Sequence, residues 1–331
     1  MRQHQAVFAN FICKFGDANM ADYLREVVLP AFTDDTLVRR ARGSYYHLLD
    51  VRLFDSLIEG ANEPAVAGQF VQDTVLVRDQ VFDQETGKLI PDEAYLDTSP
   101  SAFFVLLLKD HRLLYFAETR HAPSLSSFQS TMQRFLTDKH REFIDAVYDF
   151  EKEQGRKTTK RALKEVIPVP VLKVVPITNS ALLAEYIALF DRLQRVDLII
   201  HRKNDEPTAA SLIKNAEAYT ALLKGEQTRI TTTDKDGLDK DGAVKALAGA
   251  TDGANETIRL TGTDRHGDRL SGENDDFSVT TMIEHLAGSV KEKASSLYAK
   301  FQELVGRGEI KRPEVAPERV EQIAEAARSD A

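Results

Sequence analysis

Two halves of the chain meet at the stretch Gly155-Arg156-Lys157-Thr158-Thr159-Lys160-Arg161-Ala162-Leu163-Lys164-Glu165-Val166-Ile167-Pro168-Val169-Pro170-Val171-Leu172-Lys173-Val174-Val175-Pro176-Ile177. A glycine that can end a helix comes first, five cations follow within nine residues, and an apolar segment with three prolines closes the stretch. Three prolines at this spacing forbid a helix over 167–177 and permit only an edge strand or an extended linker. The sequence therefore predicts a basic, proline-containing hinge over 156–178, with Gly155, Pro168 and Pro170 as its hinge residues.

On the N-terminal side of this hinge, strands alternate with helices. Strands are predicted over 7–15, 44–54 and 69–82, and a hairpin over 102–108 and 113–118. The hairpin strands are apolar almost throughout, which predicts central strands covered on both faces. Ser124 is a predicted N-cap for a long helix over 125–154. Together these elements predict an α+β domain over 1–155 that the long helix closes.

A second run of helices and strands follows the hinge. One helix starts at Asn179 or Ser180, and Pro207 opens another that ends near Leu223. Further strands are predicted over 196–202, 228–233, 257–263 and 277–282, with a polar loop over 264–276. The sequence thus predicts a second α/β domain over 179–282, expected to dimerise. Residues 283–331 are predicted to form a returning C-terminal helix (283–305) followed by a charged tail (311–331). The expected fold class is α+β, with two α/β modules of mixed sheets joined by the hinge.

Composition narrows the class of protein. The 331 residues are about twice the common domain size, 42% are apolar, and the formal net charge is -9. Cys13 is the single cysteine, so no internal disulfide can form, and its apolar neighbours predict a buried side chain. No apolar run reaches the roughly 20 residues that a membrane-spanning helix needs, and the N-terminus lacks the pattern of a signal peptide. We therefore expect a cytoplasmic protein.

Catalytic and metal-binding motifs are not found in the sequence. It has no Gly-x-Ser-x-Gly, Gly-x-x-x-x-Gly-Lys or Gly-x-Gly-x-x-Gly motif, and the acidic run 234–242 has Leu238 where a calcium loop needs an oxygen ligand. His111, His121 and His140 lack metal-ligand spacing and are expected to be exposed. We expect no enzyme activity, no cofactor and no metal. A metal-dependent nuclease is the alternative, although Arg120 stands where its Glu-x-Lys motif, begun by Glu118, requires lysine.

The basic stretch is the strongest candidate for a binding site. If 158–166 is a helix, four cations share one face: Lys157, Lys160, Arg161 and Lys164. Ala162, Leu163 and Val166 would then point into a core on the other face. Phosphate is the usual partner of such a cluster, so we predict a DNA-binding surface that continues past the hinge. The predicted DNA-binding residues are Arg156, Lys157, Lys160, Arg161, Lys164, Lys173, Arg202 and Lys203. There are two alternatives for the basic stretch: a solvated face without a ligand, and a surface that binds an acidic protein partner. A second, smaller basic patch consists of Arg39, Arg40 and Arg42.

Element order and residues together give a resemblance to a known family. Four segments carry it: 102–106 and 117–120 of the hairpin, the proline-containing segment 167–174, and 189–200. Over about 102–219 this order of hairpin, helix, basic joint, proline-containing strand, helix and strand is similar to RexA-type phage exclusion proteins. The resemblance implies a non-enzymatic homodimer that binds double-stranded DNA with little sequence preference, pivots two domains around it and acts with a membrane protein encoded nearby. The net charge of -9 departs from what a DNA-binding protein usually carries. A homodimer is also expected because the apolar edge strand over 167–177 needs cover.

Overall fold

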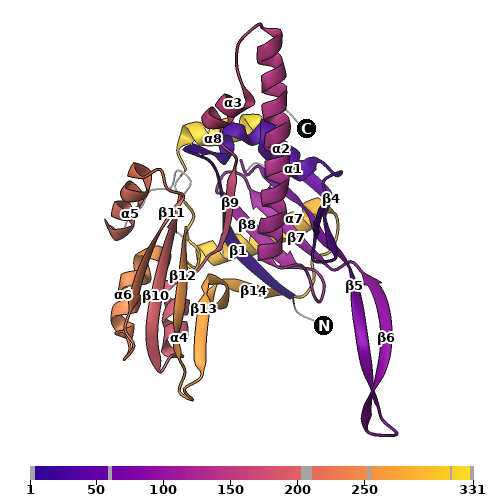
Figure 1. The fold of residues 1–331 in the computed structure, drawn as a ribbon, viewed down its shortest axis with the longest axis vertical. Coiled ribbons are helices and arrows are strands. Elements are labelled where there is room, and N and C mark those ends of the chain that lie inside the picture. The colour runs from indigo at the N-terminus through magenta and orange to yellow at the C-terminus, as the bar shows by residue number, and fades with distance from the viewer. Residues whose placement is uncertain (1–3, 59–61, 203–210, 252–254, 314, 329–331) are drawn as a thin grey trace.

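The computed structural model describes residues 4–58, 62–202, 211–251, 255–313 and 315–328. Within these ranges helices and strands both occur along the whole chain, and the strands form two sheets, one of ten strands and one of four. The α+β class predicted from the sequence is therefore confirmed. The large sheet forms the body, the small sheet lies beside it, and two elements project from the body in opposite directions (Figure 1).

The large sheet is built mostly from the N-terminal half. Its main path runs β14 (Thr280–Ile283), β1 (His4–Phe15), β8 (Arg112–Ala117), β7 (Ser101–Leu107), β5 (Ala65–Asp83), β4 (Ser44–Phe54) and β3 (Arg39–Ala41). Off this path, β2 (Ala18–Asn19) and β9 (Val171–Pro176) pair with β1, and β6 (Lys88–Thr98) pairs with β5. The predicted hairpin is present as β7 and β8, with Val105 opposite Leu114.

The small sheet carries helices on one face only. Its strand order is β11 (Gln227–Thr233), β10 (Arg192–His201), β12 (Glu256–Thr263) and β13 (Arg269–Glu273). The helices α4 (Ser180–Ala188), α5 (Ser211–Leu222) and α6 (Lys240–Thr251) bury apolar side chains against Leu198 and Ile200 of β10. Because side chains alternate along a strand, the intervening positions of β10 lie on the face without helices.

Two predictions about the sheets were wrong. Every pairing between described strands is antiparallel, so the sheets are not mixed. In the small sheet, His201 lies opposite Gln227, so the chain leaves and re-enters the sheet at the same end and β11 must run antiparallel to β10.

The predicted loop over 264–276 contains β13 and the 3-10 turn η3 (Asn274–Phe277). Leu270 is the only large apolar residue of β13, which concealed its strand character.

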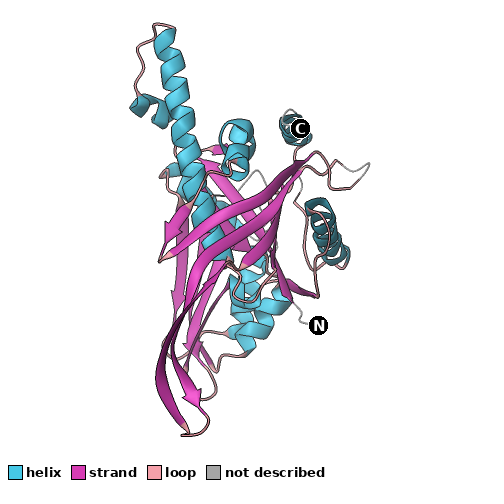
Figure 2. Cartoon of the chain, turned by 90° about the vertical axis from the view of Figure 1, so that its right-hand side faces the viewer, coloured by secondary structure: helices cyan, strands magenta, loops and turns pink. Residues whose placement is uncertain are grey.

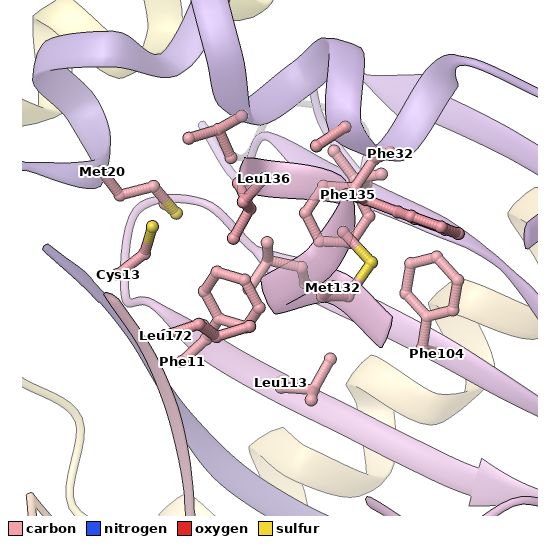
Figure 3. Packing of buried hydrophobic residues seen from close by; sticks show 14 of the residues in the cluster. Phe11, Cys13, Met20, Phe32, Phe104, Leu113, Met132, Phe135, Leu136 and Leu172 are labelled. Atoms are coloured by element: carbon pink, nitrogen blue, oxygen red, sulfur yellow. The ribbon is translucent and has the colours of Figure 1, made fainter. Parts of the chain in front are cut away.

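Separate hydrophobic clusters cover the two faces of the large sheet. Phe104 and Tyr115 belong to one cluster, while Phe103 and Leu114 belong to the other, and all four are at most 5% exposed. This alternation confirms that the hairpin strands are central and covered on both faces. Cys13 is buried in the first cluster, as predicted, and burial raises the pKa of its thiol to about 12 (Figure 3).

Helices from both halves of the chain cover these faces. The first cluster is covered by η1 (Met20–Tyr23), η2 (Leu24–Val28), α1 (Leu29–Thr33), α2 (Leu125–Glu153) and α8 (Pro317–Arg328). The second is covered by α7 (Val290–Gly306). The predicted start of α7 at Ile283 was wrong, because Gly288 has a φ of +95° and Ser289 caps the helix. The limits of α2 agree with prediction, since the Ser124 hydroxyl accepts a hydrogen bond from the Ser127 N–H (3.1 Å) and Gly155 follows the last turn with a φ of +71°.

The proline-containing segment is an edge strand, and it is covered within the chain. On one side β9 pairs with β1, with Cys13 opposite Leu172. On the other, the Gln133 and Gln129 side chains of α2 accept hydrogen bonds from Leu172 N–H and Val174 N–H, both at 2.7 Å. This cover removes the reason for expecting a dimer at this strand. The pivoting of the two domains stays a prediction.

A two-stranded arm forms one of the two projections. The outer parts of β5 and β6 pair with each other and extend beyond the sheet (Figures 1 and 2). Large apolar side chains are exposed along both strands of the arm: Val75, Leu76, Val77, Phe82, Leu89, Ile90, Tyr95 and Leu96. An isolated two-stranded hairpin is marginally stable in water, and an exposed apolar patch marks an interaction site. The arm was not predicted from the sequence, because β6 contains Pro91 and several acidic residues.

Candidate nucleic-acid interface

The basic stretch lies on the second projection, at the far end of α2. There α3 (Lys160–Val166) stands beside the last turns of α2, beyond the edge of the sheet (Figures 1 and 2). The Thr159 hydroxyl caps α3 by accepting the Ala162 N–H at 3.1 Å. No residue of α3 is buried, and Val166 is 76% exposed. The predicted burial of Ala162, Leu163 and Val166 was therefore wrong, because no second layer covers this helix.

Three of the five cations in the basic stretch form ion pairs with nearby carboxylates. Arg156 pairs with Glu151 at 2.7 Å, Lys160 with Asp145 at 2.7 Å, and Arg161 with Glu165 at 3.3 Å. The hydrogen bond from Lys160 lowers the pKa of the Asp145 carboxyl. Among the described residues, no carboxylate forms an ion pair with Lys157 or Lys164.

Acidic residues of α2 offset the charge of this projection. Residues 145–165 contain six cations (Lys152, Arg156, Lys157, Lys160, Arg161 and Lys164) and five carboxylates (Asp145, Asp149, Glu151, Glu153 and Glu165). The net charge is thus only one positive charge. Exposed ion pairs of this kind contribute little to stability, so a phosphate can replace the carboxylate partner. The long-range attraction to DNA is nevertheless weak here.

A second group of cations gathers between the two sheets. Lys173 and His201 both line two neighbouring cavities there, of about 420 and 210 Å³, which we call the junction groove. The smaller cavity is lined by Lys14, Lys173, Arg202 and Lys224, with Glu226 as its one carboxylate. Lys173 and Arg202 were predicted from the sequence, and the structure brings them together. Lys203, also predicted, lies outside the described residues.

The cations of the smaller cavity differ in how firmly they are held. Arg202 donates to the Gly225 carbonyl at 2.8 Å and pairs with the exposed Asp17 at 2.9 Å. The Lys14 ammonium donates to the Asn19 side chain and to the Asp17 carbonyl. Within the described part of the chain, neither Lys173 nor Lys224 forms an ion pair. These two ammonium groups are therefore available to an anionic ligand.

His201 reports the positive character of the groove. The residue is 8% exposed, and its Nε2 lies 2.9 Å from the Thr257 hydroxyl. Burial, together with the smaller effect of the nearby charges of Lys173 and Arg259, lowers the pKa of His201 to about 4. Positive charge in the groove thus acts against protonation of this ring.

Sequence reasoning missed several cations of the groove. Lys14 interrupts the apolar run of β1, and Lys224 follows α5. Arg229 precedes Ile230 on strand β11, and Arg259 lies between Ile258 and Leu260 on strand β12, so these arginines alternate with apolar residues. That alternation was a usable signal, since it marks the outward face of a half-covered strand. Their meeting with Lys173 could not be read from the sequence because it depends on the packing of the two sheets.

The remaining candidates lead to less coherent sites. Arg39 lies 5.2 Å from the centre of the Tyr46 ring, and Arg40 lies 5.5 Å from that of Tyr45, so both guanidinium groups contact aromatic rings. His111 and His140 are buried rather than exposed as predicted, and His140 Nε2 lies 2.9 Å from the Ile167 carbonyl oxygen. Over the described ranges, no three His, Cys, Asp or Glu side chains come together as a metal-binding group.

Comparisons with known proteins add no relative: neither the protein-family models nor the curated proteins that were searched match this chain. In the described part of the structure, no helix has both the length and the apolar character needed to cross a membrane.

Proposed function

We propose that this chain binds double-stranded DNA through its backbone, with little preference for sequence. The observation that supports this most is the convergence of Lys14, Lys173, Arg202 and Lys224, from four separate segments, around one cavity. Cations that meet only in the folded chain produce a concentrated field, and contacts with phosphate supply nearly all of non-specific DNA binding.

The α2–α3 projection extends this surface. Pro168 and Val169, which are separated from the end of α3 by Ile167, line the smaller cavity of the junction groove. Lys157 and Lys164 lie on the projection as exposed cations, and the paired Arg156, Lys160 and Arg161 can exchange carboxylate for phosphate. A duplex would thus follow a path from the projection to the groove, and the acidic surfaces that give the chain its charge of -9 would face away from it.

The resemblance to RexA-type proteins supplies the biological part of the proposal. It assigns the chain to a phage exclusion system, as a non-enzymatic, cytoplasmic protein that acts with a membrane protein. The alternatives lead to different results when the protein is incubated with plasmid and Mg²⁺. Retardation of intact plasmid supports the proposal, whereas cleavage would favour the metal-dependent nuclease. Binding of an acidic protein but not of DNA would favour the scaffold.

A homodimer is part of the same proposal, and we place its contact at the arm of β5 and β6. The exposed side chains of the arm form apolar cross-strand pairs, Leu76 with Leu96 and Phe82 with Leu89. Contact between two arms would bury these pairs and supply the further strands that a lone hairpin lacks. In light scattering, the double variant Leu76→Glu, Leu96→Glu is expected to be monomeric while the unaltered chain is a dimer. A monomeric unaltered chain at tens of micromolar would refute the dimer.

DNA binding is tested by the dependence of affinity on salt. Short duplexes of unrelated sequence should bind with similar affinity and dissociate as salt rises from about 50 to 200 mM. Because each phosphate contact contributes about 0.9 to the slope of log K against log[salt], the variant Lys173→Ala, Lys224→Ala should lose about 2 from that slope.

The matched control removes two exposed cations of α7, Lys291→Ala and Lys300→Ala, which line neither cavity of the groove. It changes the net charge by the same amount and should leave the slope nearly unaltered. An unaltered protein that binds no duplex, or a groove variant that behaves like the control, would overturn the proposal.

A further inference from the structure

We propose that the larger cavity of the junction groove is a binding site for a small phosphomonoester of mononucleotide size. Its volume of about 420 Å³ lies in the range of small-molecule pockets. Its walls come from β9, from the first turn of α2 and from the helix-free face of the small sheet. This inference does not rest on DNA binding, because its ligand is a free small molecule and two of its three cations, Arg229 and Arg259, lie outside the smaller cavity.

Three permanent cations line this cavity from three strands. They are Lys173 on β9, Arg229 on β11 and Arg259 on β12. Two carboxylates, Glu273 and Asp275, are also present, and both are exposed at the rim. Cations therefore outnumber carboxylates, and arginine adds the planar donor geometry that suits phosphate oxygens.

One buried side chain of the cavity has a ring nitrogen without a partner. His201 is more than nine-tenths buried, and its Nδ1 has no hydrogen-bond partner among the described residues. Arg259 is different, because its Nε is ion-paired with Glu273 Oε1 at 2.6 Å. Buried polar groups normally have partners, so the unpartnered nitrogen of His201 points to a missing ligand.

The first turn of α2 adds backbone donors. Leu125 and Ser126 line the cavity, and the Ser124 side chain already accepts the N–H of Ser127. N–H groups at the start of a helix have no partner inside the helix, and the helix dipole places partial positive charge there. This 29-residue helix therefore directs an anion-binding end at the same space as the three cations.

The rest of the lining indicates what is attached to the phosphate. Val174, Val175 and Ile199 provide an apolar wall, and Gln129 and Gln227 add amide groups. Guanidinium groups can also stack on a planar ring. Space for a ring beside a phosphate site is what a nucleoside monophosphate requires.

Isothermal titration with adenosine monophosphate, inorganic phosphate and adenosine tests this site on the whole chain. We expect the monophosphate to bind, inorganic phosphate to bind more weakly, and adenosine not to bind. Arg229→Ala should lower the affinity for adenosine monophosphate at least about tenfold, because it removes a charge-assisted contact. Arg195→Ala is the matched control, since Arg195 lies on the same sheet face, is paired with Asp197 at 2.8 Å, and does not line the cavity.

Two results would overturn the inference. One is that neither phosphate compound binds, and the other is that Arg229→Ala and Arg195→Ala have the same effect. Duplexes with a 5′-phosphate or a 5′-hydroxyl end distinguish the source of the phosphate, and a preference for the phosphorylated end that Arg229→Ala abolishes would assign the site to DNA ends instead. Adenosine monophosphate that binds while duplex DNA does not would keep this inference and refute DNA binding.

Discussion

The α2–α3 projection and the junction groove are both basic, but they acquire that character in different ways. On the projection six cations lie close together within residues 145–165, and five carboxylates of the same segment lie among them. In the groove each cation comes from a different segment, and one carboxylate lines the smaller cavity with four cations. The net positive charge of the α2–α3 projection is thus smaller than that of the junction groove, although its cations are closer together in the sequence.

This difference shows how a cluster of charge in a sequence differs from a charged site. Residues close in sequence are exposed to the same local surroundings, and an amphipathic helix such as α2 supplies compensating charges within one or two turns. Residues from distant strands meet only at a packing junction, where cations can converge without the carboxylates that neighbour them in the sequence. The groove should therefore be more sensitive than the projection to substitution and to pH.

The largest expected difference concerns pH and two buried histidines. The folded-state pKa of His201 is about 4, below the roughly 6.5 of an unfolded histidine, so its contribution to stability is complete above about pH 6.5 and is lost as pH falls towards 4. Between about pH 7 and pH 5 this loss amounts to about 2 kcal/mol in the free energy of unfolding. Urea denaturation of His201→Gln should show a pH dependence that is reduced by this amount.

His140, at the base of the projection, provides the comparison. Burial lowers its pKa too, but the hydrogen bond to the Ile167 carbonyl acts in the opposite direction. His140→Gln should therefore change the pH dependence less than His201→Gln does. Equal effects of the two variants would contradict the combination of burial and positive surroundings that we assign to His201.

The second largest difference between the projection and the groove is expected in DNA affinity. Lys160→Ala, Arg161→Ala removes two cations that are already paired, whereas Lys173→Ala, Lys224→Ala removes two that are not. The projection variant should lose less than about 1 from the slope of log K against log[salt], compared with about 2 for the groove variant. Fluorescence anisotropy at several salt concentrations measures both. A larger loss from the projection would reverse their ranking.

Removing the carboxylates of the projection should raise its affinity for DNA. In the variant Asp145→Asn, Glu151→Gln, Glu165→Gln the three paired cations lose their partners and the region gains three positive charges. We expect duplex affinity to rise about threefold at low salt, and the rise to fade as salt screens it. The variant Asp79→Asn, Asp92→Asn, Asp97→Asn on the arm adds the same three positive charges and is the control for an effect of total charge. No change in affinity would place the DNA away from the projection.

The smallest effect concerns stability. Since α3 has no buried residue, replacing Lys160, Arg161 and Lys164 with alanine should change the free energy of unfolding by less than about 0.5 kcal/mol. Gln133→Ala should cost about 1 to 3 kcal/mol, because Leu172 N–H would lose its acceptor. Chemical denaturation followed by circular dichroism compares the two. A costly α3 variant would mean that this helix is part of a cooperative core.

The sequence was most informative where structure depends on neighbours in the chain. The long helix was predicted within one residue at its C-terminal end, because Ser124 and Gly155 act locally. The central hairpin followed from its continuous apolar strands. Polar strands were not recognised: β6 and β13 have few buried side chains, so neither shows the alternation that burial imposes on a strand.

By itself the sequence determined the α+β class, the central strands, the limits of α2, and the presence of the cations that include Lys173 and Arg202. Only the tertiary structure decided that all described pairings are antiparallel, that the proline-containing strand is covered by glutamines of α2, and that Lys14 and Lys224 meet Lys173 beside a buried His201. The physical reason is range. Capping, turn formation and apolar periodicity act within a few residues, whereas the field and shape of a groove depend on which distant strands the packing of two sheets brings together.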